Sequence, residues 1–146
     1  MDGNDIEILN KTAFQDSGLE NLHTLSLASC KVQSIHQQTF SSLKMVKNIN
    51  LSTNNLTELT VNSFSGCSLL DTLTLSGNKI HSLAQNQFAA LASLRKIDLS
   101  SNRLRFVHQK AFVSLGASVQ EIDLTDNRLK VIREETFHSL PGLQVM

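Results

Sequence analysis

The chain repeats one pattern of apolar and polar positions every 24 residues. Each copy opens with alternation, as in Leu73-Thr74-Leu75, which is typical of a half-buried strand. A polar step ending in Asn78 follows, and further apolar residues and Phe88 close the copy. The full copies span residues 22–45, 46–69, 70–93, 94–118 and 119–142. Repetition at this period is characteristic of solenoids, so we predict one coil per copy.

Partial copies stand at both ends of the repeat frame. Residues 1–19 match the second half of a copy, and residues 143–146 open a sixth strand at Leu143 and Met146. We therefore interpret residues 1–146 as a single array, without capping domains, that is a fragment of a longer one. Exposed terminal strands pair readily with other chains, so we also expect self-association.

One column of the pattern is filled by asparagine. An amide side chain both donates and accepts hydrogen bonds, so stacked copies can satisfy the backbone groups of each turn. Cys30 takes this position in the first full copy. The predicted ladder consists of Asn4, Asn54, Asn78, Asn102 and Asn127.

Six of the seven Phe residues share a second column. We predict that their rings stack as a buried spine, because large rings carry much apolar area. An aromatic cofactor pocket is the alternative, although we expect no cofactor. The six residues are Phe14, Phe40, Phe64, Phe88, Phe112 and Phe137.

These columns resemble the 24-residue type of leucine-rich repeat found in extracellular animal proteins, such as Toll-like receptors and matrix proteins. The resemblance covers essentially the whole chain, but the clustered cysteines that cap such arrays are missing, since only Cys30 and Cys67 occur. It implies an α/β-type solenoid: a curved coil with one parallel concave sheet and a convex side of mostly extended or short helical turns.

The same resemblance implies a function in recognition. It indicates a protein ligand or co-receptor and an extracellular or cell-surface location, as in innate-immune or adhesion receptors. The alternative is a structural extracellular-matrix or apical-surface protein that assembles through its repeats.

Composition limits the other classes of function. Thirteen basic and thirteen acidic side chains balance, so nothing favours binding to nucleic acid. No apolar run approaches the roughly 20 residues of a membrane span, and the start does not resemble a signal peptide. The five His residues lack metal-ligand spacing, and no nucleophile–base set or phosphate loop appears. We therefore expect neither membrane insertion by this segment nor a metal site, and we predict that the chain is not an enzyme.

Two charged surfaces are candidate partner sites. The first is an acidic patch on the strand face, beside Arg95 and Lys96; the alternative is an ordinary solvated face with locally paired charges. Asp98 and Asp123 are column neighbours there, so weak cation binding is a further alternative. The acidic residues are Asp98, Glu121, Asp123 and Asp126.

The second surface is a basic edge just after the asparagine column. Acidic glycans or a protein partner suit such an edge, and a solvated edge is the alternative. Phe106, beside Arg105, lies off the Phe spine; it either anchors an interface or folds down against the flank. The basic positions are Lys31, Lys79, Arg103 and Arg128, with Arg105 and Lys130 two positions further on.

Three N-x-S/T sequons are candidate glycosylation sites in a secreted protein. They begin at Asn10, Asn50 and Asn55. Asn10 is the best candidate because it follows a corner, whereas Asn50 points out of a predicted strand and a glycan there obstructs the concave face.

Overall fold

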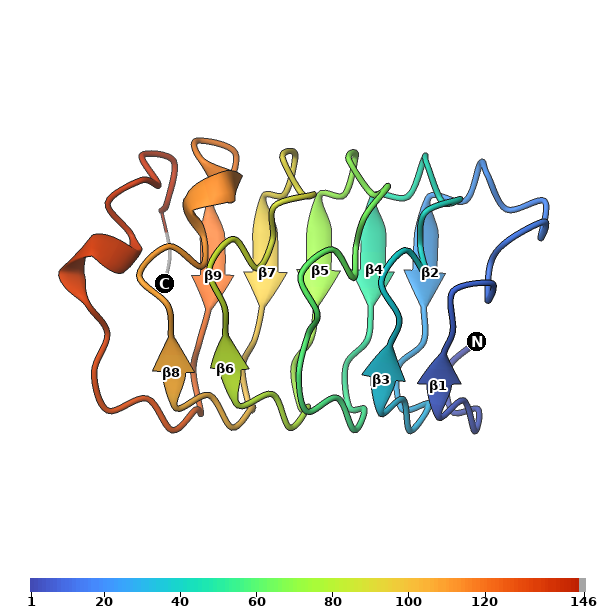
Figure 1. The fold of residues 1–146 in the computed structure, drawn as a ribbon, viewed down its shortest axis with the longest axis horizontal. Coiled ribbons are helices and arrows are strands. Elements are labelled where there is room, and N and C mark those ends of the chain that lie inside the picture. Colours follow the sequence, from blue (N-terminus) through green and yellow to red (C-terminus); the bar gives the residue numbers. More distant parts are fainter. Residues whose placement is uncertain (145–146) are drawn as a thin grey trace.

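The chain winds into a coil with a five-stranded parallel sheet on one side, which we call the front and which lies behind the shorter strands in the view of Figure 1. The computed structural model describes residues 1–144. Each front strand has three residues, of which the middle one is buried, so the apolar alternation sets which side chain enters the core. The strands are β2 (Thr24–Ser26), β4 (Asn48–Asn50), β5 (Thr72–Thr74), β7 (Lys96–Asp98) and β9 (Glu121–Asp123).

The register of this sheet follows the repeat frame. Thr24 pairs with Asn48, and Thr72 pairs with Lys96, at the 24-residue spacing of the sequence. Lys96 then pairs with Glu121, one residue further on. The extra residue is taken up near Gly116, whose φ of 53° follows a short 3₁₀ helix. The insertion therefore leaves the strand register intact.

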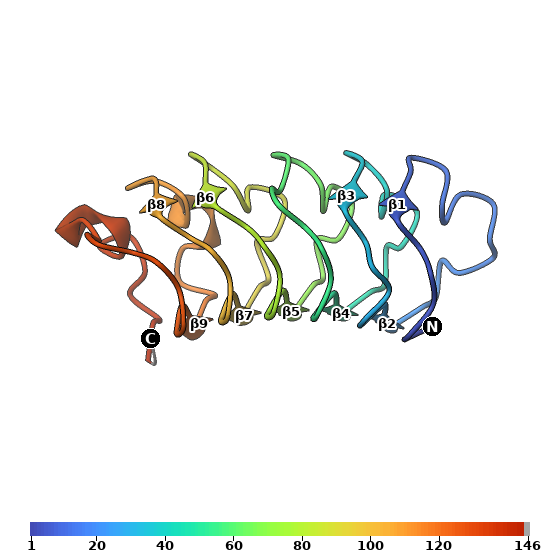
Figure 2. The ribbon, with the colours of Figure 1, turned by 90° about the horizontal axis from the view of Figure 1, so that it is seen from below.

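A second row of strands runs along the opposite side of the coil (Figure 2). These two-residue strands pair as β1 with β3 and as β6 with β8. Within residues 1–144 the chain thus has three parallel sheets. The five-stranded sheet matches the one predicted, and the two short sheets opposite it were not predicted. The short strands are β1 (Ile8–Leu9), β3 (Ser34–Ile35), β6 (Ser82–Leu83) and β8 (Phe106–Val107).

Helix contributes almost nothing to the fold. Among the described residues only two 3₁₀ helices occur, η1 (Val113–Leu115) and η2 (Glu134–Thr136). Of the expected extended or short helical turns, the helical ones are therefore not supported, and neither is the α/β character. The segment after each Phe instead folds into tight turns, in which the residue three positions on donates to the Phe carbonyl. Leu43 N–H to Phe40 O is one such bond. These short bonds return the chain to the next strand within too few residues for an α-helix.

The Phe rings form two stacked runs inside the coil, so the predicted spine is confirmed within each run. Ring centroids of successive coils lie 5.6–5.9 Å apart. One run joins Phe14, Phe40 and Phe64. The other joins Phe88, Phe112 and Phe137. Each ring thus buries apolar area that a single coil leaves exposed, so the stability of a coil depends on its neighbours.

Each ladder asparagine bonds to its own coil and to the coil before it. The side chain of Asn102 is buried; its Nδ2 donates to Leu99 O at 3.1 Å and to Leu75 O at 2.9 Å. Its Oδ1 accepts from the Ile80 N–H at 3.0 Å. Asn54, Asn78 and Asn127 repeat this arrangement.

The first positions of the ladder column differ from the rest. Asn4 is exposed and donates only within its own turn, to Met1 O at 2.6 Å. Cys30 is buried, and its thiol faces Met1 O and Ala28 O, so it replaces the amide with a single weak donor.

A second polar column, just before the Phe column, links the coils at the back. Thr39 Oγ1 donates to Leu9 O at 2.9 Å, and Gln87 Nε2 donates to Leu59 O at 2.9 Å; both side chains are buried. The repeat pattern does not reveal this column, because its members vary in type between copies.

We predict that Asn102→Ala destabilises the fold by on the order of 3 kcal/mol, because buried backbone groups of two coils lose their partners. Urea unfolding followed by circular dichroism measures the change. The matched control is Asn48→Ala, since that amide is exposed and reaches only Thr24 Oγ1 at 3.4 Å. Equal loss of stability in both variants contradicts the role of the ladder.

Candidate interaction surface

The front sheet presents two outward columns of side chains. Lys96 Nζ lies 2.7 Å from Glu121 Oε2, an exposed pair between neighbouring strands. Arg95 donates to Gln120 Oε1 at 3.0 Å and lies 3.9 Å from Asp71. Exposed pairs of this kind contribute at most about 1 kcal/mol each. Their main effect is to neutralise locally the charge that this face presents.

Two of the three aspartates of the predicted acidic patch, Asp98 and Asp123, stabilise the turns that follow their strands. Asp98 Oδ1 accepts from the Ser100 N–H at 2.9 Å and from its hydroxyl at 2.6 Å. Asp123 Oδ1 accepts from the Thr125 N–H at 2.8 Å. Asn50 makes the same bond to the Ser52 N–H at 2.9 Å, so this column has a structural role that does not require charge.

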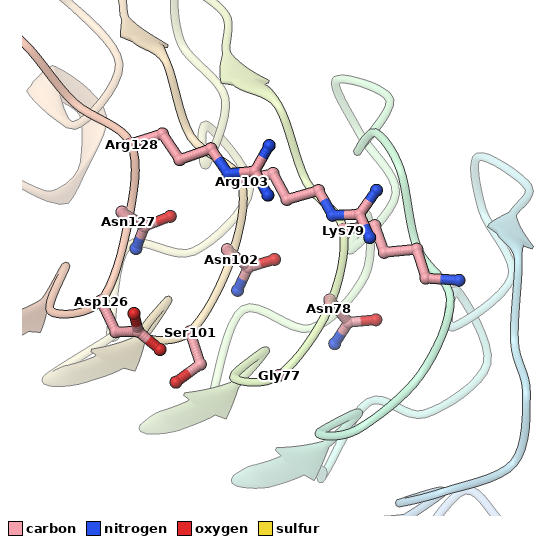
Figure 3. Close-up of a pocket in the computed structure, with 9 residues that line it drawn as sticks. All are labelled: Gly77, Asn78, Lys79, Ser101, Asn102, Arg103, Asp126, Asn127 and Arg128. Carbon is pink, nitrogen blue, oxygen red and sulfur yellow. The ribbon is translucent and has the colours of Figure 1, made fainter.

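Asp126 lies apart from this column, in the turn with a positive φ of 51°. It lines an open hollow of about 390 Å³ together with the basic row of Lys79, Arg103 and Arg128. Figure 3 shows the three basic side chains extending in one direction, with the ladder asparagines between them and the Asp126–Ser101–Gly77 row. The structure therefore groups Asp126 with the basic edge.

Lys31 occupies the same column as this row but is paired. Its Nζ lies 2.9 Å from Asp5 Oδ1, and the hydrogen bond to that carboxylate raises the pKa of the exposed Lys31. Lys31 therefore differs from the basic residues of the later coils in having its charge paired with a carboxylate.

The later coils carry further basic side chains and an exposed aromatic one, which line two hollows. Arg105, Arg128 and Lys130 line an open hollow of about 460 Å³. Phe106 is 53% exposed, and it lines a neighbouring hollow of about 190 Å³ with His108, Gln109 and Arg133. We call this surface the basic–aromatic flank: Arg103, Arg105, Phe106, Arg128, Lys130 and Arg133.

The cations of the basic–aromatic flank have no carboxylate partner among residues 1–144, where the ion pairs involve Lys31, Arg95, Lys96 and His138. Phe106 contacts His108 edge-on, at 6.4 Å between ring centroids, and its ring does not fold into the core. Exposed arginine and aromatic side chains dominate the energetics of interfaces, so this flank is the surface best suited to a partner.

The two cysteines are free and buried. Burial raises the pKa of the Cys67 thiol to about 12, so this group is protonated at neutral pH and is a poor nucleophile. The described part of the chain contains no cluster of three or more His, Cys, Asp or Glu side chains arranged to hold a metal ion. No helix within residues 1–144 has the length and apolar character needed to cross a membrane.

Comparison with protein families matches residues 5–144 to the BspA type leucine rich repeat region, a family described with six copies. The chain belongs to this leucine-rich repeat family. The repeated coils and asparagine bonds described above are consistent with that membership. No curated protein matches the chain. The family match supports the resemblance to leucine-rich repeats. It does not extend to the resemblance to Toll-like receptors.

Sequence reasoning named Phe106 but missed two residues near it in this leucine-rich repeat, Arg133 and the exposed Val131. In the column that holds Ser34 and Ser82 of the back strands, the later coils have Phe106 and then Val131, which lies outside the strands. These two side chains are 53% and 75% exposed. That switch from polar to apolar residues was the available signal. Arg133 gave none, because its approach to Phe106 depends on the path of the last coil.

The three sequons of this leucine-rich repeat differ in geometry. Asn10 is exposed, and its Oδ1 accepts from the Thr12 N–H at 3.0 Å and lies 3.1 Å from the Thr12 hydroxyl. The Asn50 side chain is held by Ser52, and Asn55 is half-buried beside the ladder. Only Asn10 therefore combines an exposed amide with direct contact to its sequon hydroxyl.

We predict that the chain, when it is secreted from eukaryotic cells, carries a glycan on Asn10 and little or none on Asn50 and Asn55. A glycan on Asn50 crowds the front sheet, and one on Asn55 crowds the turn that holds Asn54. Intact mass before and after glycosidase treatment measures occupancy, and Asn10→Gln removes the glycan. Occupancy of Asn50 above that of Asn10 contradicts the prediction.

Proposed function

We propose that this chain is a protein-interaction module of a secreted or cell-surface protein, and that its partner docks on the basic–aromatic flank. The observation that carries the proposal is Phe106, an exposed aromatic side chain beside Arg105, whose charge has no partner in the described residues. Burying such a side chain in a partner yields far more binding energy than neutral rim contacts do.

The flank is a better candidate than the front sheet. On the front face the carboxylates of Asp98 and Asp123 hold turns, and Glu121 pairs with Lys96. A partner that takes these groups has to replace bonds that already exist. On the flank, a partner carboxylate gains a bond to an arginine without replacing an ion pair among the described residues.

The extracellular location and a recognition role of the innate-immune or adhesion type belong to this proposal. The sequons and the resemblance to 24-residue extracellular repeats support them. A protein ligand or co-receptor is the expected partner, and we expect no cofactor and no catalytic activity. The balance of charge, with a formal net charge of +0, gives no support for nucleic acid as the partner.

To test this function, the chain is screened against purified secreted and cell-surface proteins, and affinities are measured by biolayer interferometry. We expect Phe106→Ser or Arg105→Glu to weaken a specific ligand about tenfold or more, because each removes a central contact. The control is the double charge reversal Asp98→Lys with Asp123→Lys on the front sheet.

The outcomes separate the two surfaces. If only the front-sheet variant loses binding, the assignment of the partner site to the flank is overturned, and the acidic patch becomes the candidate partner site. Circular dichroism and thermal unfolding establish that each variant is folded, so that weaker binding is attributed to the surface.

Assembly into a structural matrix is a second candidate function, favoured by the apolar surface of the last coil. Ile132 is 42% exposed, whereas Leu83 and Val107 in the same column are 0% and 7% exposed. Val131 beside it is 75% exposed. Exposed apolar side chains grouped in this way favour contact between copies.

If assembly is the function, the chain self-associates through this surface. Light scattering coupled to size-exclusion chromatography measures the mass over a range of concentrations. We expect dimers or larger species whose population falls in Val131→Lys with Ile132→Lys, and not in the control Lys44→Glu. A monodisperse monomer at every concentration contradicts assembly.

A further inference from the structure

The back row of strands is interrupted, unlike the front sheet. The pair β6–β8 is continued on its N-terminal side, where the His81 N–H donates to Thr57 O at 3.2 Å. On the other side of β8, the Arg128 N–H donates to Leu104 O at 2.9 Å. Beyond that bond, no backbone hydrogen bond in the described part of the chain joins residues 105–108 to residues 129–133.

The chain diverges from β8 at this point. Figure 1 shows the segment after β9 moving away from β8 towards η2, whereas the earlier coils stay side by side. The backbone N–H groups of Arg103, Arg105 and His108 all donate to backbone carbonyls of the coil before them, at 2.8–3.0 Å. One side of β8 is therefore satisfied, and its other side is a free strand edge.

Two hollows of the basic–aromatic flank lie along this free edge. Arg105 and Lys130 line one from opposite coils, and Phe106 and Arg133 line the other in the same way. Residues of both coils thus line a gap between them. On the β8 side of this gap, the backbone groups of the strand are unpaired within residues 1–144.

A comparable break follows β3, but its surroundings are different. The hollows there are lined mainly by uncharged side chains, such as Gln33, Ser34 and Thr57, and the one lysine present is Lys79. The two breaks share a backbone arrangement and differ in charge. Of these two breaks within residues 1–144, the one at β8 combines a free strand edge with several cations.

We propose that the free edge of β8 accepts an extended acidic segment of a partner protein as an added strand. Exposed strand edges bind extended peptides through main-chain hydrogen bonds, while flanking side chains set the specificity. Arg105, Lys130 and Arg133 bind the carboxylates, and Phe106 contacts an apolar side chain of the same segment.

A peptide fits this gap better than a sulfated glycan does. A glycan satisfies the cations but supplies no backbone amides for β8 and little apolar surface for Phe106 and Val131. The inference rests on the proposed function and specifies how the partner binds at the same flank.

The test uses the full chain and a short fluorescein-labelled peptide of alternating Glu and Val, with binding followed by fluorescence anisotropy. We expect saturable binding of this peptide and none of its Lys–Val counterpart. A peptide that is N-methylated at alternate amides keeps the charge but cannot pair along one edge, and we expect it to bind about tenfold more weakly or worse.

Variants of the chain locate the site. We expect Arg105→Glu with Lys130→Glu to abolish binding of the Glu–Val peptide. The matched control, Lys44→Glu with Lys47→Glu, has the same change in charge away from the flank and is expected to bind as before. Circular dichroism establishes that both variants are folded.

Several results overturn the inference. Equal binding of the methylated peptide shows that charge alone acts, and binding of heparin in preference to the peptide indicates a glycan site. An unchanged affinity in the flank variant places the peptide elsewhere. If a protein ligand still depends on Phe106 while the peptide does not bind, strand addition fails and the proposed function stands; if neither binds, both fail.

Discussion

The hydrogen bonds of the ladder asparagines are the constraint on which the rest of the structure depends. Each of Asn54, Asn78, Asn102 and Asn127 bonds to carbonyl groups of its own coil and of the preceding one. A turn of buried backbone needs such partners, since unsatisfied groups are costly. The ladder thus fixes both the turn after each front strand and the stacking of the coils.

Regular stacking turns the sequence columns into surface columns. Residues 24 apart become neighbours across the front sheet, so a property shared by a column becomes a property of a face. The basic row of Lys79, Arg103 and Arg128 arises in this way. A change within one column, such as Ser82 to Phe106, equally confines a surface to the later coils.

The front and the back of the coil differ in how regularly their backbone groups are hydrogen-bonded between coils. The front sheet has the asparagine ladder beside it and keeps its register through an inserted residue. At the back, Thr39 and Gln87 bond across coils, while Ala111 stands at the same position without a polar group. The back strands pair only in places, and the free edge of β8 with its exposed Phe106 results. The proposed binding surface thus lies where the repetition is incomplete.

The sequence by itself determined the coils, the front strands, the asparagine positions and the Phe spine, because strict periodicity reports which residues face the core. It also indicated Arg103, Arg105, Phe106 and Arg128 as surface candidates. Only the tertiary structure decided that the Asp98 and Asp123 carboxylates hold turns, that Lys31 is paired, and that Arg133 approaches Phe106. It alone also decided that the back strands form separate pairs with almost no helix. The physical reason is that these features depend on the path of the backbone between columns, where distances of a few ångströms, and not residue types, decide which groups bond.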